Sequence, residues 1–91
     1  MRIADMSKVT VRYWAAAKAA ARVPEESVEA ATLAEALDAV VSGRTPDDPL
    51  RNVLARSSFL VNATPVGRAA KESVLLDDGA VVEVLPPFAG G

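Results

Sequence analysis

The chain has 91 residues, enough for one small domain with a modest hydrophobic core. Its formal net charge is −2 and it has no basic stripe, which argues against binding to nucleic acid. Cysteine and histidine are absent, so the chain lacks the residues of disulfide frameworks, thiol nucleophiles and the usual zinc sites. We therefore expect no bound metal ion, no bound cofactor and no independent catalysis.

Hydropathy and composition also bear on location. No apolar run approaches the roughly 20 residues that a membrane-spanning helix requires, and residues 1–7 lack the apolar centre of a signal peptide. We expect residues 1–7 to be a disordered leader. Together with the absence of cysteine, these features are typical of a cytoplasmic protein that does not act at a membrane.

The first predicted strand covers residues 8–14, where apolar and polar side chains alternate. The alternation places Val9, Val11 and Tyr13 on the buried face. The alanine-rich segment 15–21 that follows favours one or two turns of helix.

A weaker strand and the main helix come next. Pro24 is expected to stop the alanine-rich turn, and residues 25–31 alternate weakly. Thr32 and Glu35 form a capping box at the start of a predicted helix over 33–42. The apolar face of this helix is formed by Leu33, Ala36, Leu37, Val40 and Val41.

Two helix boundaries rest on single residues. Gly43 is expected to end the main helix in a left-handed conformation. Asp48 is expected to cap another helix, with Pro49 at its first position and Leu50 and Leu54 on its buried face.

The second half of the chain contains two further strong strands. Residues 59–63 form an apolar run that Thr64-Pro65 is expected to end, with Phe59 assigned to the core. Residues 71–76 suggest a loop with a short strand, and Asp78-Gly79 is typical of a turn.

The last predicted strand, residues 81–85, is apolar on both faces except at Glu83, which favours the interior of a sheet. We expect Glu83 to be exposed at an edge or paired with a base. Strong first and last strands with one main helix between them predict an α+β fold of the β-grasp, ubiquitin-like type. In this fold the main helix packs on a mixed sheet whose first and last strands pair in parallel. The domain would cover residues 8–85.

The end of the chain carries the most distinctive pattern. An extended tail over residues 86–91 follows the last strand without a spacer, and its six residues span roughly 20 Å. The tail consists of Pro86, Pro87, Phe88, Ala89, Gly90 and Gly91. The prolines stiffen its exit, and the small residues allow the backbone into a narrow channel. We therefore interpret residues 86–90 as a partner-binding tail and the Gly91 α-carboxylate as the reactive group.

These residues resemble the sulfur-carrier small subunit of molybdopterin synthase, the MoaD family. The most specific similarity runs from Asp78-Gly79 through the strand at 81–85 to the two prolines and the final diglycine. Weaker similarities lie at residues 11–18, 32–37 and 60–62. Ala80 departs from the pattern, because the family often has a second acidic residue there.

The resemblance implies a specific chemistry. A ubiquitin-activating-type enzyme would use ATP to adenylate Gly91, and a sulfur donor protein would convert the adenylate to a thiocarboxylate. The chain carrying the thiocarboxylate would then dock on the large catalytic subunit and pass sulfur to the pyranopterin precursor of molybdopterin. One face of the sheet would serve as an apolar docking patch.

Several alternatives remain open from the residues. The chain could serve thiamine, cysteine or tungsten cofactor pathways, act as a ubiquitin-like protein modifier, or be an inert interaction module. Phe88 could anchor in a partner or fold back on its own domain. Arg12, Arg68 and Lys71 could steer an acidic partner, although solvated surface charge is the simpler interpretation.

Overall fold

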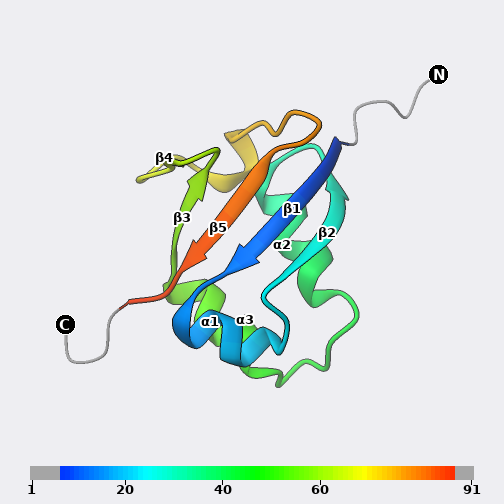
Figure 1. The fold of residues 1–91 in the computed structure, drawn as a ribbon, viewed down its shortest axis with the longest axis vertical. Helices are drawn as coiled ribbons and strands as arrows, with labels where there is room; N and C mark the ends of the chain where they lie inside the picture. The colour runs from blue at the N-terminus through cyan, green and yellow to red at the C-terminus, as the bar shows by residue number, and fades with distance from the viewer. Residues whose placement is uncertain (1–6, 88–91) are drawn as a thin grey trace.

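The structure, a computed structural model, describes residues 7–87. Across these residues five strands form one mixed sheet in the order β2-β1-β5-β3-β4. α2 packs against one side of the sheet, and α1 and α3 lie together near the end where β1 and β5 finish (Figure 1). β1 (Ser7–Tyr13) and β5 (Val81–Leu85) lie side by side in parallel at the centre. The predicted β-grasp topology is confirmed, and the main helix is accompanied by the two shorter helical segments that the sequence also predicted.

The first strand and helix follow the local sequence signals closely. β1 begins at Ser7, which had been given to the predicted leader, while residues 1–6 lie outside the described part of the chain. Val9, Val11 and Tyr13 are buried, as the alternation predicted. β1 leads directly into α1 (Ala15–Ala21).

α1 ends at the predicted residue but for a different reason than expected. Arg22 adopts a left-handed conformation with φ 67°, and its N–H donates to the Lys18 carbonyl at 2.9 Å. This closes the helix two residues before Pro24, which was wrongly expected to stop it. The chain then returns as β2 (Glu25–Ala30), antiparallel to β1.

α2 (Leu33–Val41) is the predicted main helix. The Thr32 hydroxyl accepts a hydrogen bond from the Glu35 N–H at 3.2 Å, while Glu35 Oε1 accepts one from the Ala31 N–H at 2.8 Å. At the other end Ser42 keeps a right-handed conformation and its hydroxyl donates to the Ala39 carbonyl at 2.9 Å. Gly43 does not have a positive φ, so the left-handed stop expected there is wrong.

The next segment builds the other half of the sheet. α3 (Pro49–Arg56) starts as predicted, with Asp48 Oδ1 accepting from the Leu50 N–H at 2.9 Å. It leads into β3 (Ser58–Val61), antiparallel to β5. Asn62 and Ala63, with φ 50° and 69°, then form a tight turn of the kind that joins hairpin strands.

This turn changes the interpretation of Thr64-Pro65. These two residues form β4 (Thr64–Pro65), which pairs with β3, whereas the sequence predicted that they only end a strand. A short 3-10 helix, η1 (Lys71–Ser73), and a single bridge between Leu75 and Thr32 occupy the expected loop. The turn at Asp78-Gly79 is confirmed, with Gly79 at φ 89°.

The core lies between the inner face of the sheet and the helices. The sheet contributes the inward residues of its strands, and the helices contribute one face each. The buried members include Val9, Val11, Tyr13, Ala17, Leu33, Ala36, Val40, Leu50, Leu54, Phe59, Val82 and Val84. Burial of this apolar surface is the main force that holds the fold together.

Candidate functional site at the root of the tail

The tail leaves the sheet at the end where β1 and β5 finish. Because β1 and β5 are parallel, their carboxyl ends meet at the same side of the sheet, where α1 also begins (Figure 1). Pro86 is partly buried and Pro87 is exposed. Phe88, Ala89, Gly90 and Gly91 lie outside the described residues, so their predicted roles stay predictions.

The two prolines lie between two hollows. The larger, of about 550 Å³, is mostly apolar and is lined by Trp14, Ala15, Arg56, Ser58, Leu85, Pro86 and Pro87. The smaller, of about 320 Å³, is lined by Ala16, Pro49, Asn52, Val53, Arg56, Pro86 and Pro87. Arg56 lines both hollows.

Trp14 and Glu83 are the residues of this region that the sequence interpretation missed. Trp14 is 46% exposed, and its Nε1–H donates to Glu83 Oε2 at 3.1 Å. Both expectations for Glu83 are wrong, because β5 is an interior strand and the partner is an indole N–H. The signal in the sequence was a single tryptophan at the end of the first predicted strand, and the parallel pairing of β1 with β5 is what brings it beside the tail.

The backbone beside Trp14 is unusual. Ala15 has φ 50°, in the left-handed region that residues with a Cβ seldom occupy. Trp14 itself is extended, and its N–H donates to the Val84 carbonyl at 3.2 Å. Strained backbone of this kind is concentrated at functional sites.

The outer face of the sheet, opposite the helices, is divided into two halves. Over β1 and β2 it carries charged side chains, including the cross-strand pairs Lys8 with Glu29 and Arg12 with Glu25. Over β5, β3 and β4 it carries the partly exposed apolar residues Val81, Leu85 and Leu60 and the exposed Pro65, and the Glu83 carboxylate, which accepts from the Trp14 indole, lies between Val81 and Leu85. The apolar half is continuous with the root of the tail through Leu85.

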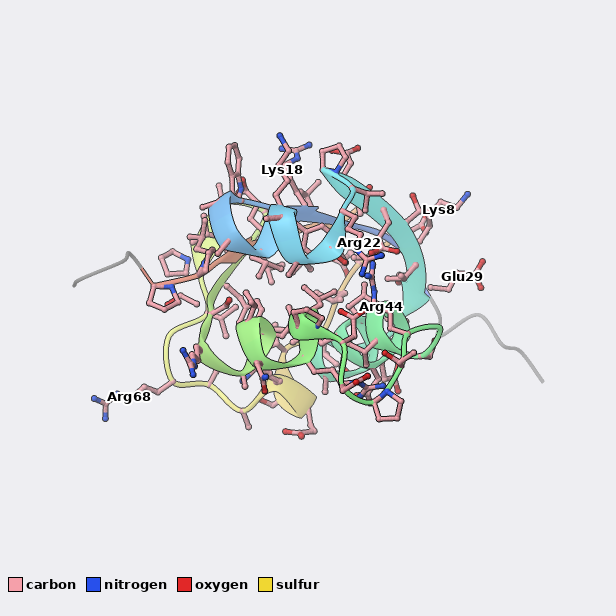
Figure 2. The ribbon with its side chains drawn as sticks, turned by 90° about the horizontal axis from the view of Figure 1, so that it is seen from below. Lys8, Lys18, Arg22, Glu29, Arg44 and Arg68 are labelled. Atoms are coloured by element: carbon pink, nitrogen blue, oxygen red, sulfur yellow. The ribbon has the colours of Figure 1, made fainter. Side chains whose placement is uncertain are left out.

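The other candidate charges have local roles. Arg12 Nε donates to Glu25 Oε1 at 3.2 Å, and the Lys71 ammonium lies 5.4 Å from the centre of the Phe59 ring. Arg68 extends away from the body (Figure 2). The structure does not bring these three residues together into one patch.

A polar cluster holds the end of α1 against α2 and α3. Arg44 donates to Glu26 Oε2 at 3.2 Å and to the Val40 carbonyl at 2.9 Å, and Figure 2 shows its side chain inside the body. The Tyr13 hydroxyl donates to the same Glu26 oxygen at 2.5 Å. Burial first, and then this hydrogen bond, raise the pKa of Tyr13 far above its usual range. A hollow of about 610 Å³ lies here, but its charged groups are largely paired with one another, which indicates a structural cluster.

Residues 7–87 contain neither a metal site nor a membrane-spanning helix. Among these residues no three aspartate or glutamate side chains are grouped so that they could hold a metal ion. In the same range no helix has both the length and the apolar content to cross a bilayer.

The ThiS family model matches residues 11–91. The chain belongs to the ThiS family. The matched range covers both the root of the tail and the tail itself. None of the curated proteins matches this ThiS-family chain.

Solved structures place the ThiS-family chain among β-grasp proteins. SAMP1 from Methanosarcina acetivorans, a small archaeal modifier protein, has a TM-score of 0.78 at 22% identity and covers 94% of this chain and 98% of its own. A Pyrococcus furiosus protein assigned as molybdopterin converting factor subunit 1 has a TM-score of 0.70 at 25% identity, covering 90% and 99%.

A third structure includes a partner. It is a complex of subunits 1 and 2 of the molybdopterin-converting factor from Helicobacter pylori, with a TM-score of 0.66 at 25% identity, covering 92% of this chain and 99% of that one. Together with the family match, these structures confirm that the chain is a β-grasp sulfur carrier of the MoaD/ThiS type.

Proposed function

We propose that this carrier is the small subunit of a molybdopterin synthase in the cytoplasm. The observation that carries the proposal is the position of the tail: Pro86 and Pro87 continue an interior strand at the edge where β1 also ends. The family match through residue 91 supports a working role for Gly91.

The proposed chemistry has two steps. On an activating enzyme of the ubiquitin-activating type, a Gly91 carboxylate oxygen attacks the α-phosphorus of ATP and releases pyrophosphate, which gives an acyl-adenylate. Sulfide (HS⁻) supplied by a donor protein then attacks the carbonyl carbon of the acyl-adenylate and forms the carbon–sulfur bond. The carbon–oxygen bond to AMP breaks, AMP leaves with that electron pair, and loss of the sulfur-bound proton gives the thiocarboxylate. A carboxylate is a poor electrophile because it has no good leaving group, and adenylation supplies one. ATP is a substrate of the activating enzyme in this scheme, and no cofactor is bound by the carrier.

The thiocarboxylate then delivers sulfur without a cysteine, which fits a chain that contains none. In the large catalytic subunit the tail, residues 86–91, would hold this sulfur beside the pyranopterin precursor. Tethering a reactive group in a partner's pocket makes the transfer effectively intramolecular. General acids and bases would belong to the partners.

We propose the apolar half of the outer face as the docking surface for the large subunit. The complex of subunits 1 and 2 from Helicobacter pylori supports a partner of this kind. A Leu60→Glu variant should lose most capture of the large subunit, because it buries a charge in the contact. Ser27→Glu on the charged half is the matched control, and equal capture by both variants would contradict this choice of surface.

A second candidate is a carrier for another sulfur pathway, which the match to the ThiS family favours. A ubiquitin-like modifier, with Gly91 joined to a target lysine, would share the activation step.

One experiment tests the proposal and separates these candidates. The chain is incubated with its activating enzyme, ATP and a sulfur donor, and its intact mass is measured before the large subunit and precursor are added. Replacement of one oxygen by sulfur, followed by its loss as molybdopterin forms, is the expected result. Sulfur that stays on the chain would indicate another pathway, and higher-mass conjugates would indicate a modifier.

A further inference from the structure

Trp14 is the only tryptophan in the chain, and it lies where the tail begins. An exposed tryptophan contributes little to the core, so its packing does not explain its position. Its backbone N–H donates to the Val84 carbonyl of the neighbouring parallel strand. The side chain therefore starts beside the last residues of β5.

The ring is also fixed by its nitrogen. Glu83, whose Oε2 accepts the indole N–H at 3.1 Å, lies on the strand that β1 and β3 hold from both sides. An acceptor on an interior strand is a rigid support. Trp14 is thus held at its backbone and at its ring.

The held ring forms one wall of the larger hollow, together with Leu85, Pro86 and Pro87. Proline has no N–H, so residues 86 and 87 cannot donate hydrogen bonds to the ladder that orients the rest of β5. With these two donors missing, side-chain packing becomes an important means of orienting the segment.

We propose that Trp14, held by Glu83, is a positioning residue that sets the direction in which the tail leaves the sheet. The inference rests on the proposed function, because the direction matters when the tail must enter a partner's active site. Trp14 would act through Pro86 and Pro87 and would not touch the reacting carboxylate. Reactions of this kind are sensitive to small errors in the placement of the reacting group.

The test compares two substitutions that remove the same charge. Glu83→Gln keeps an oxygen that can accept the indole N–H, whereas Glu83→Leu removes the acceptor. Nuclear Overhauser effects between the Trp14 ring and the Pro86 and Pro87 rings, and residual dipolar couplings of the amides after Pro87, report the orientation of the segment. We expect wild-type values for Glu83→Gln. In Glu83→Leu the Overhauser effects should be lost and the couplings reduced.

Kinetics of adenylation by the activating enzyme supply the second readout. For Glu83→Leu and Trp14→Ala we expect kcat to fall about tenfold or more with little change in KM, because docking persists while alignment is lost. The Glu83→Gln variant should have the kcat of the wild-type chain. Leu75→Ala, which shortens an exposed apolar side chain elsewhere, should behave as wild type.

Two results would overturn the inference. Unchanged Overhauser effects and couplings in Glu83→Leu would show that the hydrogen bond does not orient the tail. A rise in KM with unchanged kcat would make Trp14 a partner contact instead. If the wild-type chain is not adenylated, the proposed function fails, but the spectroscopic comparison still decides the role of Trp14.

Discussion

The two ends of the central strand pair, β1 and β5, are built differently. Where β5 begins, a network of hydrogen bonds ties the preceding turn to β1: the Gly79 N–H donates to the Lys8 carbonyl at 2.8 Å, and the Lys8 N–H donates to Asp78 Oδ1 at 2.7 Å. Where β5 ends, Pro86 and Pro87 have no N–H to donate and lie between two hollows.

Both ends also contain a left-handed residue. At the turn it is Gly79, which adopts φ 89° at little cost, and at the tail it is Ala15, for which the left-handed region costs about 1–2 kcal/mol. The turn end therefore combines hydrogen bonds with low strain, as a stabilising element does. The tail end combines strain, an exposed aromatic ring and proline, which suits the presentation of a segment to partners.

Deleting Gly91, or adding one residue after it, should have the largest effect on function. Thiocarboxylate formation should be abolished because the reacting carbonyl is moved or lost, while the free energy of unfolding stays unchanged. Intact mass and urea titration measure the two quantities. A truncated chain that still acquires sulfur would contradict the assignment of Gly91.

Leu33→Ala should have the largest effect on stability. Leu33 is fully buried in α2, away from the tail, so the free energy of unfolding should fall by about 2–5 kcal/mol. Urea titration measures the loss, and the exposed Leu75→Ala serves as control. At a temperature where the variant is folded, sulfur loading should proceed as in wild type. If the folded variant loads less sulfur than wild type at that temperature, the stability of the body and the function of the tail are not independent.

Gly79→Ala tests the turn end. An added Cβ meets nothing within 4 Å, so the cost is the backbone conformation alone, about 1–2 kcal/mol of unfolding free energy. Gly43→Ala is the matched control, since Gly43 also has open space but no positive φ. Equal stability of the two variants in thermal unfolding would count against a strained position at Gly79.

Tyr13→Phe should lower the free energy of unfolding by about 0.5–1.5 kcal/mol at neutral pH, because the hydroxyl loses its bond to Glu26. Burial and that bond raise the pKa of Tyr13 above its ordinary value of 10.0. The folded protein therefore keeps the proton that the unfolded chain releases above about pH 10, and stability should fall by up to about 1.4 kcal/mol per pH unit. Urea titrations at alkaline pH should show this fall in wild type and a shallower one in the variant. Identical pH dependence of the unfolding free energy in the two proteins would contradict a raised pKa of Tyr13.

Ala15→Gly should have the smallest effect. Relief of the left-handed strain offsets the greater freedom of glycine in the unfolded chain, so the net change should be near zero. Ala19→Gly, at an exposed position in the same helix, should lower the free energy of unfolding by about 1 kcal/mol. Thermal unfolding of both variants measures the difference, and equal losses would argue against strain at Ala15.

The elements that the sequence predicted well are those set by neighbours in the chain. The alternation around Val9 and Val11, the cap at Thr32 and the start of α3 at Asp48 all depend on residues a few positions apart. The parallel pairing of β1 and β5 was predicted because both strands have strong signals and the last one is apolar on both faces.

The features that the sequence did not predict depend on contacts between distant residues. Trp14 and Glu83 are separated by 69 positions, and their hydrogen bond exists because the parallel register brings both strand ends together. The hairpin at Asn62 was missed because its sequence, Asn-Ala, lacks the usual glycine. Asn62 holds that turn through Oδ1, which accepts from the Val81 N–H at 2.9 Å.

The position of the sulfur atom tests the central claim most directly. Trypsin should release residues 72–91 as one peptide, because no lysine or arginine follows Lys71. After loading with the activating enzyme, ATP and a sulfur donor, fragmentation of this peptide should place the exchange of oxygen for sulfur at Gly91. Sulfur located on any other residue, or none on the chain after a verified adenylation reaction, would contradict the account.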